Sequence, residues 1–354
     1  MVKTCDFGLF FIFLNIEQNY LTEMKSRIIL TFVIIPILIL SACEKERGKE
    51  IDSDVEISFS TSFYASAVPS KAGLYDNSNI ITDNEGNFSV ISYNSKTGTK
   101  HLENVEWVYY MYYPDAPEAS GWRFRHDNVL YERYWPQTYG LDFFAYMPHD
   151  LANSNVTIDL DYRTFSCNLP LGKDGQDSTQ EFIYAYETDQ TAETDNGNVN
   201  LKFKHPFAAV IFMLGEAHGN TSIHNVGLDN IHYKETFDIR NGAWSLSGET
   251  GKLSISVGRT VGVAGDTGIQ LNSIIGGPYL VIPQDTDGIK ISCSFKWNSP
   301  EATEIEKVLG EGEWQPGHIY TYVLNLGDTE ENMLAGVSIK PWDVIGHKNE
   351  IEVE

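Results

Sequence analysis

Cysteine and basic residues are both scarce in this sequence. Only four of the 354 residues are cysteine, and 25 lysines and arginines stand against 49 aspartates and glutamates, for a formal net charge of −24. So few cysteines exclude a disulfide-stapled scaffold, and the aromatic residues are the better candidates for holding the fold together. Binding to nucleic acid needs clustered Lys and Arg to neutralise phosphates. The composition therefore argues against nucleic acid as a partner.

The sequence signatures of common enzymes are also missing. There is no glycine-rich dinucleotide fingerprint, no G-x-S-x-G elbow and no H-E-x-x-H pair. Residues 248–252 (GETGK) match only part of a phosphate loop, because Leu246 stands where its first glycine belongs and Leu253 follows the lysine. Residues 285–288 (DTDG) place a glycine at the fourth position of a calcium loop, which needs it at the sixth. Both segments are expected to be turns, and we expect no enzymatic activity, cofactor or metal.

One long apolar run is present, and it lies near the N-terminus. Residues 28–40 (IILTFVIIPILIL) follow two basic residues. The run is shorter than the roughly 20 residues of a comfortable membrane span but suits the apolar region of a signal peptide. It leads into Leu-Ser-Ala-Cys, which resembles the bacterial lipobox and ends at Cys43. We predict that residues 1–43 are a signal peptide with an upstream extension, translation starting at Met24; the less favoured alternative is an internal hydrophobic helix.

Lipidation at Cys43 would place the chain in a bacterial envelope, held in the outer membrane or at the cell surface. Several acyl chains anchor a protein stably, because each buried methylene contributes about 0.8 kcal/mol. Residues 44–54 (EKERGKEIDSD) are charged and polar, which is typical of a tether.

Strict alternation of apolar and polar residues dominates the rest of the chain. It covers residues 55–63, 156–162, 289–297 and 320–326, and a period of two indicates half-buried strands. Clusters of turn-forming residues separate such runs, at 83–86, 195–198, 247–249 and 276–278. Many short strands with frequent turns predict an all-β sandwich or barrel.

The length favours two such units rather than one, at about 150 residues per domain. The most polar interval is 186–200. We place the boundary there, which gives an N-terminal β-sandwich over residues 55–195 and a C-terminal one over residues 196–354.

One histidine and two cysteines lie on the same face as apolar residues in alternating segments, and they have two interpretations. His205 shares a face with Leu201 and Phe203, and is expected to be a core histidine with a hydrogen-bond partner rather than a metal ligand. Cys167 and Cys293 both alternate inward. An exported protein could join them in a disulfide, but two separate core thiols are favoured because they fall in different predicted domains.

A cluster of aromatic residues also allows two interpretations. It comprises Trp107, Tyr109, Tyr110, Tyr112, Tyr113, Trp122 and Tyr131. These rings could form a platform on which sugar rings stack. Strand residues packed on both faces of a sandwich explain them more simply.

Five segments, taken in order, resemble the fimbrillin (type V pilin) family of Bacteroidota, in its fimbrillin-like lipoprotein branch. They are WP at 135–136 with LDFFAYMP at 141–148, LKFKHPFAAV at 201–210, YLVIPQ at 279–284, WQPGHIY at 314–320 and VSIKPW at 337–342. Each motif alone is weak, but their order is fairly specific. The resemblance implies two transthyretin-like β-sandwich domains in tandem and assembly outside the cell.

The resemblance also implies a mechanism of assembly. In that family a trypsin-like protease removes an N-terminal strand, and a C-terminal strand of another subunit fills the exposed groove. Residues 55–63 are the expected removable strand, and Lys71 is the expected cleavage site, where polymerising members present Arg. The expected donor strand is 336–345, with Val337 and Ile339 filling pockets and Trp342 as an anchor. The alternative is that this strand completes its own sandwich.

Two functions follow as expectations. The first is a surface fimbrial subunit (stalk, tip or anchor) that polymerises with copies of itself or with other fimbrial subunits and contributes to adhesion to a host protein or glycan. The second is a surface glycan-binding lipoprotein, which the aromatic cluster favours.

Overall fold

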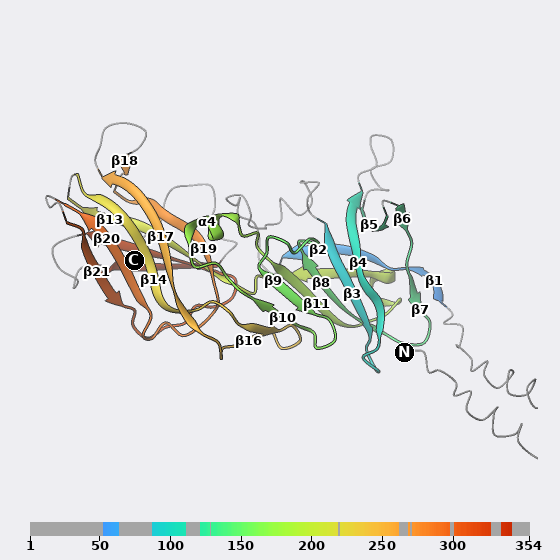
Figure 1. The fold of residues 1–354 in the computed structure, drawn as a ribbon. Helices are drawn as coiled ribbons and strands as arrows, with labels where there is room; N and C mark the ends of the chain where they lie inside the picture. Colours follow the sequence, from blue (N-terminus) through green and yellow to red (C-terminus); the bar gives the residue numbers. More distant parts are fainter. Residues whose placement is uncertain are drawn as a thin grey trace, which may run out of the picture. The chain divides into compact units, whose positions relative to one another are not determined.

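The fold is all-β, as the alternation predicts, and it is drawn in Figure 1. The computed structural model describes residues 52–63, 87–110, 121–127, 129–218, 220–261, 268–269, 271–297, 301–326 and 334–341. The only α-helix in these ranges is the short α4 (Lys173–Ser178), and a 3₁₀ turn, η3 (Thr194–Gly197), precedes the strand that begins at Asn198. No helix in these ranges has the length and apolar character needed to cross a membrane.

The N-terminal part contains two strand pairs and one six-stranded sheet. The N-terminal strands make two small ladders: β1 (Asp52–Glu56) pairs with β7 (Tyr134–Pro136), and β2 (Ser58–Phe63) pairs with β12 (Asn198–Phe203). A six-stranded sheet has the order β11 (Ile183–Gln190), β8 (Leu141–Met147), β3 (Phe88–Asn94), β4 (Lys100–Tyr110), β5 (Gly121–His126) and β6 (Val129–Tyr131). The strand predicted at 55–63 thus exists, with a break at Ile57.

A middle sheet combines strands from both predicted domains. Its order is β16 (Ala243–Ser245), β15 (Thr236–Asp238), β10 (Thr164–Cys167) and β9 (Val156–Asp159). The strand predicted at 156–162 therefore ends early. Tyr162 lies in the turn after β9 and is 73% exposed, because the side chain of Asp159 accepts backbone hydrogen bonds from Asp161 and Tyr162 and closes the turn.

Two further sheets face each other in the C-terminal part. One has the order β19 (Ser273–Val281), β13 (Ala208–Ala217), β22 (His318–Leu326) and β23 (Leu334–Pro341). The other has the order β18 (Gly268–Ile269), β17 (Thr250–Val261), β14 (Ser222–His232), β20 (Lys290–Lys296) and β21 (Thr303–Val308). The predicted strands at 289–297 and 320–326 correspond to β20 and β22.

The turn predicted at 276–278 is wrong, because these residues lie inside β19. The ladder between β13 and β19 shifts its register at this point. Gly277 has φ +102°, and a Cβ there would lie 2.5 Å from the carbonyl oxygen of Val210. Glycine here serves a bulge where two backbones approach closely, rather than a chain reversal.

Apolar side chains gather in three cores. The N-terminal core lies between the first two strand ladders and the six-stranded sheet, and includes Ile57, Trp107, Phe143 and Val199. The C-terminal core lies between the two C-terminal sheets and includes Leu228, Cys293, Trp314 and Tyr322.

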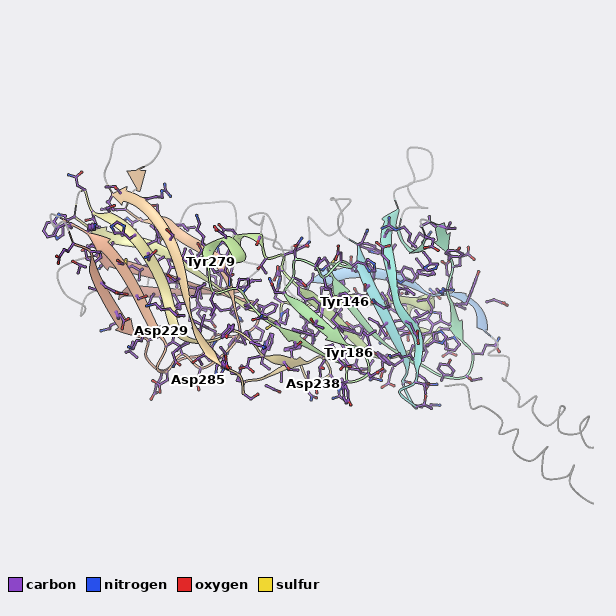
Figure 2. The ribbon with its side chains drawn as sticks, viewed as in Figure 1. Tyr146, Tyr186, Asp229, Asp238, Tyr279 and Asp285 are labelled. Carbon is purple, nitrogen blue, oxygen red and sulfur yellow. The ribbon has the colours of Figure 1, made fainter. Side chains whose placement is uncertain are left out.

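The middle core joins side chains from both halves of the chain. It contains Phe144 and Tyr146 from β8, Phe165 and Phe237 from the middle sheet, and Phe207 just before β13. Tyr146 is labelled in Figure 2. Because of this core, β3 and β8 are buried on both faces. The division into two domains at residue 195 stays a prediction. Two observations bear on it: the middle sheet combines strands from both sides of residue 195, and β12, which follows that residue, pairs with β2.

Candidate assembly surfaces

The chain's own N-terminal strand occupies an aromatic groove. Ile57 is fully buried, and Phe59 is 6% exposed. The Phe59 ring contacts three rings edge to face, with centroid distances of 4.6 Å to Trp107, 5.5 Å to Phe143 and 6.0 Å to Phe88. Such pairs add about 0.5–1.5 kcal/mol to the area they bury. Phe59 is therefore the main apolar anchor of β2.

The opposite face of β2 makes side-chain hydrogen bonds to β12. The two strands are parallel, with Ser58 opposite Asn198 and Ser60 opposite Asn200. Asn198 Nδ2 donates to Ser60 Oγ at 3.0 Å, and Ser62 Oγ donates to Asn200 Oδ1 at 3.0 Å. Ser58 Oγ donates to Asn198 Oδ1 at 3.5 Å. Each asparagine thus bonds the serine two residues beyond the one opposite it, and Asn198 also bonds Ser58, directly opposite.

The neighbouring strand β1 passes close to Gly197. This residue has φ +85°, and a Cβ there would lie 2.6 Å from Val55 Cγ1 and 2.8 Å from the Glu56 carbonyl oxygen. The Gly197 carbonyl accepts a hydrogen bond from Trp135 Nε1 at 3.0 Å. Glycine is needed here both for the backbone angle and for the close approach. Partial burial of Glu56 raises its pKa above the ordinary value of 4.5. The positive charge of Arg123 acts in the opposite direction but is the smaller effect.

The C-terminal strand β23 forms an edge of its sheet. It pairs antiparallel with β22, with Val337 opposite Tyr322 and Ile339 opposite Tyr320. The two tyrosines are buried at 3% exposure each, whereas Val337 is 39% exposed and Ile339 is 58% exposed. The apolar row of β23 is thus paired through its backbone but poorly covered by side chains.

The predicted site residues fall into two groups. Val337 and Ile339 lie together on β23. Cys43, Lys71 and Trp342 lie outside the described residues. Sequence reasoning missed Asn198, Asn200 and Gly197, which fell in the polar interval where the domain boundary was placed. The available signal was the alternation N-V-N-L-K-F at 198–203.

The aromatic cluster divides between core and surface. Trp107 and Trp122 are 2% and 4% exposed, so these two rings pack the N-terminal core. Tyr131 is 45% exposed and contacts the buried Phe124 at a centroid distance of 5.7 Å. Tyr112 and Tyr113 lie outside the described residues. The two tryptophans therefore offer no face on which a sugar ring could stack.

His205 and the two cysteines lie where residues with a role in the core are expected to lie. His205 Nδ1 lies 2.6 Å from the buried carboxylate of Glu181. Cys167 and Cys293 are free and lie in different cores, and burial raises the pKa of each thiol to about 12. In the part of the chain that the structure describes, no group of three or more His, Cys, Asp or Glu side chains could hold a metal ion.

Comparisons with known proteins point to one family. The sequence profile described as fimbrillin-like matches residues 71–342. A fimbrial protein from Bacteroides vulgatus is 14% identical with a TM-score of 0.54, over 82% of this chain and 100% of that chain. The tip fimbrial protein Mfa3 from Porphyromonas gingivalis is 11% identical with a TM-score of 0.35, over 72% of this chain and 94% of that chain. A search of curated proteins finds no match.

Proposed function

The chain belongs to the fimbrillin-like family, and from this we propose that it is a fimbrial subunit that polymerises by strand exchange. Membership makes it a pilin-like adhesion protein of the cell surface or fimbrium rather than an enzyme. The proposal adds export as a lipoprotein through Cys43, transient anchoring in the outer membrane, cleavage at Lys71 and assembly of tandem transthyretin-like sandwiches with other fimbrial subunits. A host protein or glycan is the proposed adhesion target.

The observation that carries the proposal is the groove filled by the chain's own strand β2. Strand β2 and the preceding Ile57 are held by one parallel ladder with β12, by serine–asparagine hydrogen bonds and by the burial of Ile57 and Phe59. Its removal would leave unpaired backbone groups on β12 and an aromatic trough, which together form a template for an added strand.

The edge strand β23 suits the part of donor. Val337 and Ile339 lose little by leaving their present positions, because both are more than one-third exposed there. In an aromatic groove each would gain about 25 cal/mol for every Å² of apolar surface buried. The same exposure argues against the alternative that these two side chains complete the chain's own core.

Limited proteolysis tests the proposal. The exported protein is incubated with a limiting dose of trypsin and followed by size-exclusion chromatography and intact mass. Polymers that appear with a cut after Lys71, and that fail to appear in a Lys71→Ala variant, are the expected result. A protein that is cut there and stays monomeric would contradict strand exchange.

A pair of surface variants tests the donor strand. Val337→Ser with Ile339→Ser should leave a folded monomer and strongly reduce polymers. The matched control is Leu246→Ser with Val308→Ser, which removes apolar side chains of 40% and 54% exposure elsewhere and should polymerise normally. Deletion of residues 336–354 should also leave a folded monomer without polymers. An unfolded product would instead show that β23 completes its own sandwich.

The glycan-binding alternative has less support, because it rested on the aromatic cluster, whose two tryptophans are buried. Persistent monomers that are retarded on polysaccharide affinity gels would favour it.

A further inference from the structure

The groove distinguishes the two faces of the strand that it holds. Its inner side takes Ile57 and Phe59, and its outer side bonds the hydroxyls of Ser58, Ser60 and Ser62 through two asparagines. Figure 1 shows β2 in blue within the N-terminal part. A strand that fits this groove therefore carries the pattern apolar, serine, apolar.

The C-terminal strand repeats this pattern. Residues 337–340 read V-S-I-K, and residues 57–60 read I-S-F-S. Placed in the same parallel register, Val337 takes the position of Ile57, Ser338 that of Ser58 and Ile339 that of Phe59. The exposed apolar row of β23 then faces the aromatic pockets, and its serine lies opposite Asn198.

We propose that the buried pockets of Ile57 and Phe59 set the register of the incoming strand, so that residues 337–339 of a second copy of this chain occupy the positions of residues 57–59. This inference rests on the proposed strand exchange and adds to it the identity of the partner, its register and the pockets that select that register. Asn198 Oδ1 accepts from Ser338 Oγ in the assembled state, as it accepts from Ser58 Oγ in the free subunit.

A charge of the groove supports the same register. The position of Ser60 falls to Lys340, and Asn198 Nδ2, which bonds Ser60, also donates to the exposed carboxylate of Asp195 at 3.2 Å. Lys340 cannot accept the bond that Ser60 accepts. Its ammonium can instead approach the Asp195 carboxylate, and the attraction between these opposite charges compensates for the lost hydrogen bond.

Other registers fit less well. A shift of one residue turns every side chain to the opposite face, and would place Ser338 in an aromatic pocket. A shift of two residues keeps the faces, but it brings either Ala335 or Ile339 to the position of Ile57, with Val337 or Pro341 at that of Phe59. The pocket of Phe59 would then hold Val337, which is smaller than Ile339, or Pro341, which is stiffer.

Disulfide trapping tests the register. Asn200 lies opposite residue 60, so the inference places it opposite Lys340 of the second copy. Neighbouring strands lie about 4.8 Å apart, within the range of Cα distances that a disulfide bridges. Asn200→Cys with Lys340→Cys should therefore form intermolecular disulfides after trimming. Asn200→Cys with Ser338→Cys, which reports the shifted register, should form several-fold fewer. Asn200→Cys with Ser60→Cys is the positive control before trimming.

The outcomes separate this inference from the function on which it rests. If unmodified protein fails to polymerise after trimming, the proposed function fails. If it polymerises but the Ser338 pair cross-links as well as or better than the Lys340 pair, or neither cross-links, the register is wrong while strand exchange stands.

The pocket of Phe59 supplies a gain-of-function variant. Ile339 is smaller than the phenylalanine it replaces there and is 58% exposed in the free subunit. Ile339→Phe should leave the monomer intact and slow the dissociation of polymers by about threefold or more, since one buried methylene contributes about 0.8 kcal/mol. Faster dissociation would place residue 339 outside this pocket.

Discussion

The Phe59 side chain should decide how firmly the N-terminal strand is held. It is 6% exposed and contacts three aromatic rings at its position in the groove. Truncating a buried phenylalanine to alanine typically costs about 3–5 kcal/mol. Because β2 lies in a two-stranded ladder, we expect this cost to appear as local detachment of the strand rather than as unfolding of the chain.

The expected magnitude follows from that cost. At about 1.4 kcal/mol per factor of ten, even the lower figure raises the detached population roughly a hundredfold. Hydrogen exchange by mass spectrometry reports this population in peptides that cover residues 52–63. The Phe59→Ala variant should exchange these amides about a hundredfold faster and leave β13 and β22 protected.

Two controls make the measurement specific. Phe165→Ala removes a fully buried ring from the middle core, and it should destabilise the chain without selective exchange at residues 52–63. Tyr162→Ala removes a ring that is 73% exposed and should change nothing. A less than threefold effect of Phe59→Ala, or equal acceleration throughout the chain, would refute the reasoning.

Two further predictions concern titratable groups. Burial raises the pKa of Glu56 above 4.5, so β1 is held most firmly below pH 4.5 and loses stability as the pH rises from 4.5 to the raised pKa. The Glu56→Gln variant should remove this loss. Relative to intrinsic rates, its residues 52–56 should exchange more slowly than those of the unmodified protein at pH 7, with little change at pH 4. An equal effect at both pH values would contradict it. Cys167 and Cys293, each with a pKa of about 12, should react with a thiol reagent at pH 8 only when the chain unfolds; labelling of the folded protein, mapped by peptide mass, would contradict their burial.

Much of the fold could be predicted from residues that alternate on one face. The row from Ile289 to Phe295 gave β20 because one face packs in the C-terminal core and the other carries lysine and serine. The resemblance to fimbrillins, drawn from five motifs, is confirmed by the family match. Both results depend on local pattern, which the sequence displays directly.

The middle core could not be predicted, because it depends on contacts between distant strands. The alternation in residues 141–147 (LDFFAYM) is incomplete, and β8 proves to be buried on both faces. A strand of that kind shows no period from which its second partner could be read. The two asparagines that bond the serines of β2 were missed for a related reason. Asn198 and Asn200 resemble loop residues in the sequence, and only their pairing with β2 shows their role.

The middle core also determines how the subunit responds to heat or tension. Phe144 from the six-stranded sheet and Phe207 from the start of the C-terminal sheets belong to one core, so neither part can melt without exposing the apolar surface of the other. We therefore expect one calorimetric transition for the body of the subunit. The first strand is the exception, because its contacts lie at the N-terminal core alone. Under the proposed strand exchange, a cooperative body with one separately held strand would let the chain give up that strand while the rest of its fold stays intact.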